Sequence, residues 1–341
     1  MPANAEVGTP ARALRRPGSG EGSGLRVLVI TNMYPTPAEP EFGCFVRDQV
    51  DDVRALGVEV DVLAFDGRRR RSRYLGACRH LRRELRRRYD IVHAHYGLTG
   101  AVAASQMRTP VITTFHGSDA WIPWQRAVSR LVARRTEPIA VAPVIADSLG
   151  VRDAAIIPCA VDLDQFVPVD REDARRALGW PTDGRCILLP AARGDGTKVV
   201  RKQVHVFDAM IELLRRGSPE VFPASLDGLS REGVSLAMNA ADVAVMTSLW
   251  EGAPVGVKEA LACQTPVVSV VVGDVSDVVH GLPGCAIVPR DPAALAAAVR
   301  EALRAGRHSR LREAMQVYGR RRIADRVVGV YQRRLAKAAS R

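Results

Sequence analysis

The sequence predicts an α/β protein of two domains, each built around a parallel sheet. Its 341 residues exceed the roughly 250–300 residues at which a single hydrophobic core stops growing. Short apolar strands alternate with helical segments in two series, one before and one after the acid- and turn-rich stretch Val161–Asp170. That stretch is typical of a hinge between two domains.

The first series starts at Leu25–Thr31, a β-branched apolar run that ends in the Pro-containing loop Asn32–Phe42. Helical spacing follows over Phe45–Leu56 and stops at a glycine, after which Val58–Ala64 alternates as a strand. A parallel sheet places its working loops at the carboxyl ends of such strands. The other elements predicted in this half are a basic helix Tyr74–Arg88, a strand Ile91–His95, a small-residue helix Ala101–Met107 and a strand Val111–Phe115.

The second series repeats this alternation and predicts a second parallel sheet. A last helix is predicted over about Arg310–Lys337, and it could run back over the first domain. We therefore divide the chain into a disordered tail 1–24, a first domain 25–165, a second domain 166–310 and a terminal helix 311–341. The second-half strands are Cys186–Pro190, Val221–Leu226, Val243–Thr247, Pro266–Val271 and Ala286–Val288, and the helices are Gln203–Arg215, Ser235–Ala240, Val255–Cys263 and Pro292–Ala305.

Composition excludes several classes of protein. The hydrophobic share of 47% and charged share of 25% are ordinary for a globular chain, whereas 5% aromatic residues disfavour a β-sandwich or a base-stacking nucleic-acid binder. The six cysteines form no C-x-x-C pair, which indicates free thiols in a reducing compartment. The first 24 residues lack the apolar core of a signal peptide, and no apolar run reaches the roughly 18 residues of a membrane span. We expect a cytoplasmic protein.

The net charge of +12 is concentrated in one stretch, since residues 67–89 hold eleven arginines against the single acid Glu84. Such a stretch, Arg68–Arg88, is consistent with peripheral contact to an anionic membrane at its inner surface. An ordinary solvated helix face is the alternative. A nucleic-acid site is disfavoured because aromatic residues and a known binding motif are missing.

The most informative window is Asn239–Val278, in which a strand, a loop, a helix and a strand follow in quick succession. Glu251 and Glu259 bracket seven residues there, and the small loop Gly252–Ala253 precedes the helix. Backbone N–H groups and the dipole of a helix N-terminus suit a phosphate or sugar hydroxyls. Two solvated glutamates on a surface helix are the alternative that spacing alone leaves open.

This window carries the pattern S-x-W-E-G-x-P, then K-E-A-x-A-C, then P-V-V. The pattern resembles the donor-site signature of retaining glycosyltransferases of family four, which have the GT-B architecture of two Rossmann-like domains. Within that family the chain is most similar to teichuronic-acid-biosynthesis glycosyltransferases. The resemblance implies a nucleotide-sugar donor, a carbohydrate, lipid-linked or small-molecule acceptor, and no further cofactor.

The resemblance also implies roles for residues of the second half. Glu251 would meet the hydroxyls of the donor sugar, and Glu259 would meet the ribose. The loop Gly252, Ala253, Pro254 and Val255 would contact sugar and phosphate. Arg193 and Lys202 would clamp the diphosphate, because negative charge builds on the leaving group. Lys198, in the stretch Gly194–Lys198, is an alternative to Lys202, and this stretch lacks the spacing of a P-loop.

In the first half, Gly43 ends a loop that resembles the family's opening loop, where a missing Cβ lets backbone approach a ligand. His116 and Asp119, in Thr113–Asp119, fall just past a strand end, where the family has a histidine near the reacting face of the sugar. A loop histidine and a capping aspartate are the alternative. His95 also ends a strand and could contact the acceptor or simply fill space.

The implied chemistry is transfer with retention at the anomeric carbon. No side chain is assigned as a base, because the leaving phosphate would assist deprotonation of the acceptor while His116 orients the sugar. A D-x-D metal motif is missing from the donor loops, since Asp162-Leu163-Asp164 lies in the hinge. We therefore expect no metal.

Two departures from the family pattern affect this interpretation. The hinge has Ile157-Pro158-Cys159-Ala160 ahead of Val161-Asp162, where the family usually has Asn-Gly, and the segment between Arg215 and Asn239 is short for two strands and a helix. Part of the wall that faces the nucleotide is thus expected to be trimmed. Two rival functions remain: a non-catalytic nucleotide-sugar-binding partner subunit, and a nucleotide-sugar epimerase.

Overall fold

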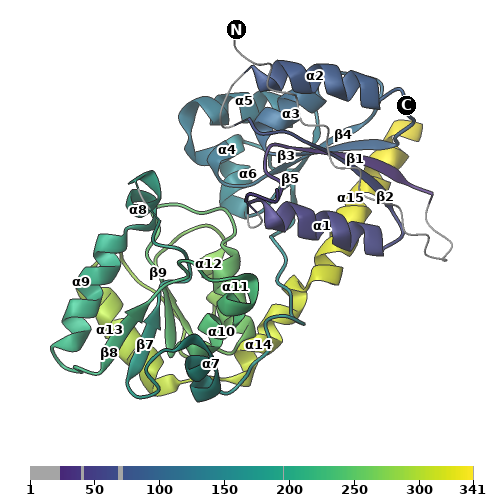
Figure 1. Cartoon of the computed structure of the whole chain (residues 1–341). Coiled ribbons are helices and arrows are strands. Elements are labelled where there is room, and N and C mark those ends of the chain that lie inside the picture. The colour runs from purple at the N-terminus through teal and green to yellow at the C-terminus, as the bar shows by residue number, and fades with distance from the viewer. Residues whose placement is uncertain (1–23, 40–41, 68–71, 195, 341) are drawn as a thin grey trace, which may run out of the picture.

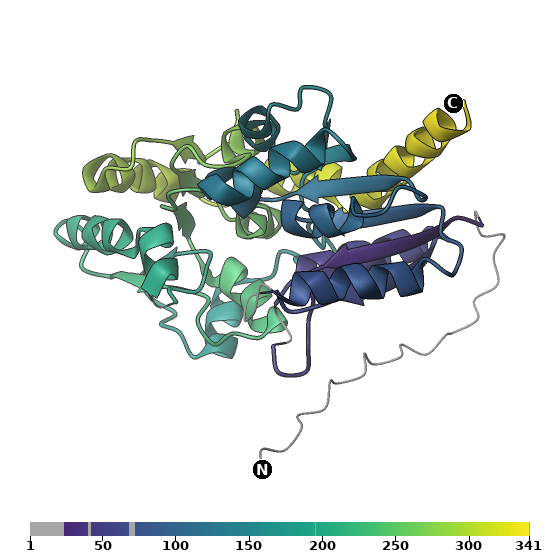
Figure 2. The same ribbon diagram turned by 90° about the horizontal axis from the view of Figure 1, so that it is seen from above.

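The computed structural model describes residues 24–39, 42–67, 72–194 and 196–340, and it shows two parallel sheets side by side (Figures 1 and 2). The first sheet has the order β2-β1-β3-β4-β5-β6, with β1 hydrogen-bonded to both β2 and β3. Strand β1 is almost continuously apolar, as expected for a strand covered on both faces, whereas β2 at the edge of the sheet alternates. The strands are β1 (Arg26–Thr31), β2 (Glu59–Ala64), β3 (Ile91–His95), β4 (Val111–Phe115), β5 (Glu137–Ala140) and β6 (Ala155–Ile156).

Helices cover the first sheet on both faces. One face packs on α1, whose Val46, Val50 and Val53 are buried, and the other packs on α2 through Ala77 and Leu81. Figure 1 shows α1 below the sheet and α2 and α3 above it. The helices of this domain are α1 (Cys44–Ala55), α2 (Arg73–Glu84), α3 (Gly97–Ala103), α4 (Ser118–Trp121), α5 (Pro123–Ala133) and α6 (Pro143–Leu149).

The second sheet has five strands in the order β11-β10-β9-β7-β8, and all its pairings are parallel. Between α9 and α10 the chain forms the single strand β8, as the short segment before Asn239 predicts. The strands are β7 (Arg185–Leu188), β8 (Val221–Ala224), β9 (Val243–Met246), β10 (Val267–Ser269) and β11 (Ala286–Ile287). The helices are α7 (Arg171–Leu178), α8 (Gly196–Lys202), α9 (Val204–Arg215), α10 (Arg231–Ala240), α11 (Val255–Ala262), α12 (Val275–Val279), α13 (Pro292–Ala305) and α14 (Ser309–Met315).

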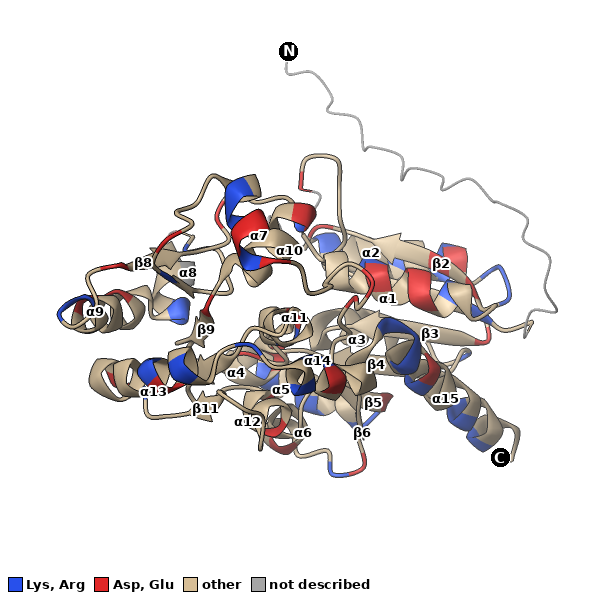
Figure 3. Cartoon of the chain, turned by 90° about the horizontal axis from the view of Figure 1, so that it is seen from below, with Lys and Arg blue, Asp and Glu red and all other residues tan. Residues whose placement is uncertain are grey.

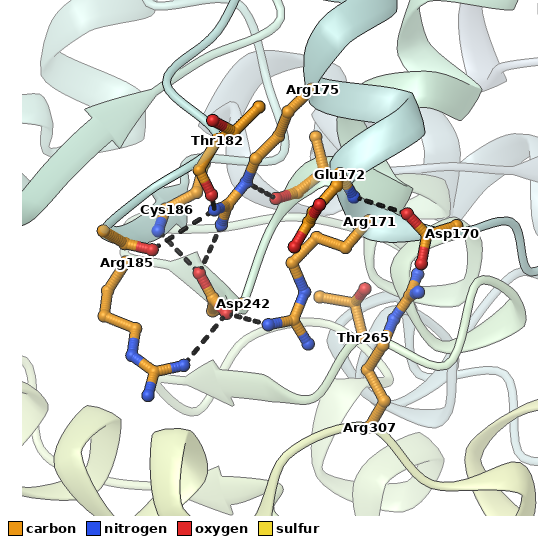
Figure 4. A network of polar contacts seen from close by, with 12 residues as sticks. Asp170, Arg171, Glu172, Arg175, Thr182, Arg185, Cys186, Asp242, Thr265 and Arg307 are labelled. Carbon is orange, nitrogen blue, oxygen red and sulfur yellow. Dashed lines mark hydrogen bonds and ion pairs between the residues drawn. The ribbon is translucent and has the colours of Figure 1, made fainter.

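A buried ionic network fixes α7 to the amino ends of β7 and β9 (Figure 4). Asp242, which is 4% exposed, accepts from Arg175 Nη2 at 2.6 Å and from the Cys186 amide at 2.7 Å. Arg171 bonds to the other carboxylate oxygen of Asp242, and Arg185 lies 3.6 Å from it. Because catalytic loops lie at the carboxyl ends of parallel strands, this network serves the stability of the domain.

The chain crosses between the domains twice, and the two crossings lie side by side. The Val161 amide donates to the Tyr318 carbonyl oxygen at 3.0 Å, close to the short η1 helix (Gln316–Tyr318). Arg320 then bonds to Asp162 at 2.8 Å and to Asp52 of α1 at 2.7 Å. This cluster joins the hinge, the first domain and the last helix.

The last helix, α15 (Arg320–Ala339), belongs to the core of the first domain. Its Ile323, Val327 and Tyr331 are buried there, and Figure 1 shows it running past the first sheet. The continuous helix predicted over Arg310–Lys337 is wrong, because the chain is extended at Gly319 (ψ 147°). The part before that glycine, α14, packs on the second core instead.

Most predicted strands and helices are confirmed, and several of them have shifted ends. Helix α2 ends at Glu84 instead of Arg88, α3 begins at Gly97 instead of Ala101, and α10 begins at Arg231 instead of Ser235. Gln203 (φ 52°) separates α8 from α9. Elements not predicted are α4, α5, β5, α6, β6, α7, α8 and α12. Among the described residues, no helix is long and apolar enough to cross a membrane.

Candidate active site

Loops at the carboxyl ends of the two sheets touch each other between the domains. The loop after β9, which contains Glu251 and Gly252, packs on the loop after β4, which contains His116. A Cβ on Gly252 would lie 2.5 Å from the His116 carbonyl oxygen, and Trp121 Nε1 donates to the Glu251 carbonyl oxygen at 3.3 Å. The close approach therefore requires glycine at position 252.

The rest of this second-domain loop continues the contact. Ala253 is 9% exposed and packs in a cluster of first-domain residues that includes Phe115 and Ala120. Pro254 is the N-cap of α11, and Val255 is the first residue of that helix. The four predicted donor-loop residues thus form the junction between the domains, ahead of a helix N-terminus.

His116 is packed among aromatic rings, with ring centroids 4.6 Å from Tyr96, 5.1 Å from Phe45 and 5.4 Å from His95. Its Nε2 lies 3.2 Å from His95 Nδ1, a hydrogen bond in which one ring donates and the other accepts. Burial, with a smaller contribution from His95, lowers the pKa of His116 well below its usual value. The imidazole is therefore neutral at physiological pH.

Asp119 positions the backbone on both sides of this histidine. Its Oδ2 accepts from the His116 amide and its Oδ1 from the Gly97 amide, both at 2.7 Å. Burial raises the pKa of Asp119 to about 6, although these hydrogen bonds act in the opposite direction. With both oxygens bonded to backbone, the side chain predicted to contact the donor holds the β3 and β4 loops together.

Tyr96 is a site residue that the sequence did not indicate. It has φ 76° and ψ 148°, a backbone conformation that is strained for a bulky side chain and is often found at functional sites. Burial is the main reason that the pKa of its hydroxyl lies well above the usual value. Nothing in a single sequence signals a positive φ at a tyrosine.

Two cationic side chains at the end of α8 bind the Glu251 carboxylate. Lys202 Nζ donates to Oε1 at 2.7 Å and Arg201 Nη1 to Oε2 at 2.9 Å. Burial lowers the pKa of Lys202, and Arg201 adds to that effect while Glu251 opposes it. The structure thus brings together two residues predicted for the donor site, Glu251 and Lys202. It adds Arg201, the neighbour of Lys202, for which no role was predicted.

Arg193 follows β7 at a separate position. Its guanidinium forms two hydrogen bonds to Asp208 of α9, at 2.7 and 3.1 Å, and its amide donates to Asp227 at 3.0 Å. No bond to Glu251 or Lys202 is found among the described residues. Lys198 lies within α8, and its side chain is outside the described residues.

Glu259 lies inside α11 and is 3% exposed. Its Oε1 forms an ion pair with Arg231 Nη1 at 2.5 Å. Burial raises the pKa of Glu259, and Arg231 opposes that shift. Arg231 also lies over the Phe166 ring at 4.6 Å. The carboxylate predicted to meet a ribose is therefore buried and paired with an arginine.

Gly43 precedes α1 with φ 74°, and a Cβ there would lie 2.5 Å from the Met33 carbonyl group. Glycine is required at this position by the approach of the chain to its own loop. In the described residues, no group of three or more His, Cys, Asp or Glu is arranged to hold a metal ion.

Comparison with known proteins identifies the two halves separately. Residues 11–165 match the family model described as Glycosyltransferase Family 4, and residues 224–305 match the one described as Glycosyl transferases group 1. The chain is 31% identical over 328 residues to D-inositol 3-phosphate glycosyltransferase of Actinosynnema mirum, covering 76% of this chain and 78% of that protein. It is 32% identical over 276 residues to the protein of that name from Geodermatophilus obscurus, covering 63% of this chain and 59% of that protein.

Three further proteins are similar to this chain in sequence or in structure. The putative teichuronic acid biosynthesis glycosyltransferase TuaC of Bacillus subtilis is 25% identical over 349 residues, which cover 81% of this chain and 88% of that protein. Sucrose-phosphate synthase from Thermosynechococcus elongatus superimposes with a TM-score of 0.71 at 19% identity, covering 92% of this chain and all of that one. Anabaena HepE in complex with UDP-glucose does so with a TM-score of 0.62 at 15% identity, covering 92% of this chain and all of that one. The GT-B architecture predicted from the sequence is confirmed, and the chain belongs to the family 4, group 1 glycosyltransferases.

Proposed function

We propose that this protein transfers a sugar from a nucleotide-diphosphate donor to an acceptor hydroxyl, with retention of the anomeric configuration and without a metal ion. One observation carries the proposal. The contact between Gly252 and the His116 backbone joins two loops, one carrying the Glu251 carboxylate with its two cations and the other carrying the neutral imidazole of His116. Sugar hydroxyls, a diphosphate and an acceptor need such groups in one cleft.

In this proposal each group has one task. Glu251 accepts hydrogen bonds from the donor sugar, and Lys202 and Arg193 balance the charge that develops on the departing diphosphate. Glu259, whose carboxylate is held by Arg231, accepts from the ribose diol. His116 stays neutral and orients the sugar, while the leaving phosphate takes the acceptor proton.

Relatives and structural neighbours suggest the first substrates to try. HepE was solved with UDP-glucose and with UDP, so UDP-sugars are the first donors. D-inositol 3-phosphate and a teichuronic-acid-type saccharide are the first acceptors, following the names of the relatives. We place the reaction on the cytoplasmic side of the membrane, with peripheral contact through α2.

The experiment measures release of nucleoside diphosphate from a panel of UDP-, GDP-, ADP- and dTDP-sugars with both acceptors. NMR of the product gives the anomeric configuration, and a parallel reaction in EDTA tests the need for a metal ion. Glu251→Gln is expected to lower kcat about 100-fold or more. Glu301→Gln, at a side chain 73% exposed, is the matched control. An inverted product, or full loss of activity in EDTA, would contradict the mechanism.

The Arg231–Glu259 ion pair favours one alternative, a non-catalytic nucleotide-sugar-binding subunit, because it occupies the carboxylate expected to bind ribose. Such a protein would bind a donor tightly in the same panel but neither transfer nor hydrolyse it. A product that is an epimerised donor, formed without any acceptor, would instead identify an epimerase.

A further inference from the structure

Arg201 lies where a donor diphosphate would meet the second domain, although the resemblance assigns it no role. It is the penultimate residue of α8, and its guanidinium donates to Glu251 Oε2 at 2.9 Å. The same guanidinium lies 5.1 Å from the centre of the Trp250 ring. The side chain is therefore held in place on the loop that precedes α11.

The backbone around Arg201 is tied to the same loop. The Leu249 amide donates to the Arg201 carbonyl oxygen at 2.8 Å, and the Thr247 hydroxyl donates to that of Lys202 at 2.7 Å. These bonds align the end of α8 with the carboxyl end of β9. Both cations thus sit on a rigid part of the site, as positioning of a charged ligand requires.

The charge of Arg201 also reaches the first domain. Its charge acts on the hydroxyl of Tyr96, where it lowers the pKa against the larger effect of burial. The Tyr96 ring in turn packs on His116 at 4.6 Å. The side chain of Arg201 is 28% exposed against 13% for Lys202, so it is the more accessible of the two cations.

The balance of charge differs between the two groups of cations in this domain. Arg201 and Lys202 share the single carboxylate of Glu251, which leaves a surplus of one positive charge. Arg193 faces the carboxylate of Asp208 while its amide bonds to that of Asp227. A phosphate is therefore attracted to Arg201 and Lys202 more strongly than to Arg193 as it stands.

We propose that Arg201 binds the diphosphate of the nucleotide sugar together with Lys202, and that Glu251 occupies the anion position in the empty protein. Arrival of the phosphate oxygens displaces the Glu251 carboxylate from the two cations. The carboxylate then becomes free to accept hydrogen bonds from the sugar. This inference rests on the proposed function, since it names a further residue of the same donor site.

Binding of UDP, followed by titration calorimetry, tests the proposal, with uridine as the probe that lacks phosphate. Arg201→Gln is expected to weaken UDP about 10- to 100-fold, the loss typical of a hydrogen bond between charged groups. Uridine binding should not change, and Arg201→Lys should recover part of the affinity. Arg304→Gln, at a side chain 68% exposed on α13, is the matched control.

A second variant gives a result that a purely structural ion pair would not. Glu251→Gln removes the competing carboxylate, so it should tighten UDP binding several-fold when Arg201 is present and much less in the double variant Arg201→Gln/Glu251→Gln. This comparison holds even if Arg201→Gln alone is poorly folded. Equal UDP affinity in wild type, Arg201→Gln and Glu251→Gln overturns the inference and leaves the proposed function standing. If wild type binds none of UDP, GDP, ADP and dTDP, the proposed function fails with it.

Discussion

A Cβ on Gly252 would lie 2.5 Å from the carbonyl oxygen of His116 and 3.1 Å from Val141 Cγ2, so the two domains meet at a point with no room for a side chain. The first separation is shorter than any ordinary contact between a carbon and a carbonyl oxygen. The approach of the two domains and the placement of the loop after β9 are therefore set by the same glycine.

Gly252→Ala is expected to push the donor loop away from His116. Overpacking of this kind costs about 1–3 kcal/mol, and a displacement of catalytic groups lowers kcat/KM by about 100-fold. Thermal unfolding and donor turnover measure the two effects. Gly76→Ala, in a helical position with open space around it, is the control: it should leave turnover unchanged and raise stability slightly, by about 0.5–1 kcal/mol. Wild-type turnover in Gly252→Ala would show that this contact does not position the site.

Stability should fall as the pH is lowered below about 6.5, because three buried histidines remain neutral in the folded protein. Burial lowers the pKa of His95 to about 3, and it places those of His93 and His116 well below the usual value. The unfolded chain therefore binds these protons first. Asp119, with its pKa raised to about 6, acts in the opposite direction, as do Asp52, Glu259 and Asp274, whose pKa values burial also raises. The histidines dominate just below pH 6.5, because an ordinary carboxyl group in the unfolded chain is still ionised there.

Urea unfolding between pH 7.5 and pH 5 measures this dependence. His116→Asn should reduce its slope by about 1.4 kcal/mol per pH unit, which corresponds to one proton. His205→Asn, at an exposed position of α9, should leave the slope unchanged. A slope that is the same in all three proteins would mean that His116 is not kept neutral by folding.

Asp242→Asn is expected to destabilise the second domain by about 3–5 kcal/mol, since it leaves Arg175 buried without its counter-ion. Arg175 is 2% exposed and would keep bonds only to carbonyl oxygens such as that of Ala240. Chemical denaturation measures the loss, and Asp183→Asn at an exposed position is the control. An Asp242→Asn protein as stable as this control would contradict the structural role of the network.

Exposed arginines on and after α2 are expected to bind anionic vesicles. Each contributes about 1 kcal/mol near an anionic surface, so replacing Arg82, Arg83 and Arg86 by Ser should reduce co-sedimentation with phosphatidylserine-containing vesicles. Figure 3 shows basic residues along α15 as well. A control variant that replaces the exposed Arg321, Arg322 and Arg333 of α15 by Ser removes the same amount of charge from a different surface. Equal loss in the two variants, or equal binding to neutral vesicles, would exclude a specific face. Arg68–Arg71 of the predicted stretch lie outside the described residues.

The alternation of strands and helices was enough to predict both sheets, because central strands such as β1 and β9 carry a run of apolar residues that a parallel sheet covered on both faces buries. The elements between Ser118 and Ala140 were not predicted, because they lack such an apolar run. Helix α5 starts at Pro123 and exposes Trp124 and Leu131, so its hydrophobic pattern is blurred, and β5 is only four residues long with a proline in it. Gln203 gave no sign of the break between α8 and α9, since a positive φ is rare for glutamine.

The site was predictable where the pattern was local and not where it depends on the fold. The loop from Glu251 to Val255 and the lysine at 202 follow from the motif and its spacing. The pairing of Glu259 with Arg231 does not, because the two side chains are 28 residues apart and meet only through the packing of α10 beside α11. In the same way, nothing local shows that Arg193 bonds to Asp208.

The position of α15 also determines the order in which the protein can be completed during synthesis. The core of the first domain needs Ile323, Val327 and Tyr331, which the ribosome adds only after the whole second domain. Until α15 is synthesised, an apolar face on α1 and the first sheet therefore stays uncovered while the second domain folds. Nascent chains released before residue 320 would expose that face, which makes them targets for chaperones and proteases.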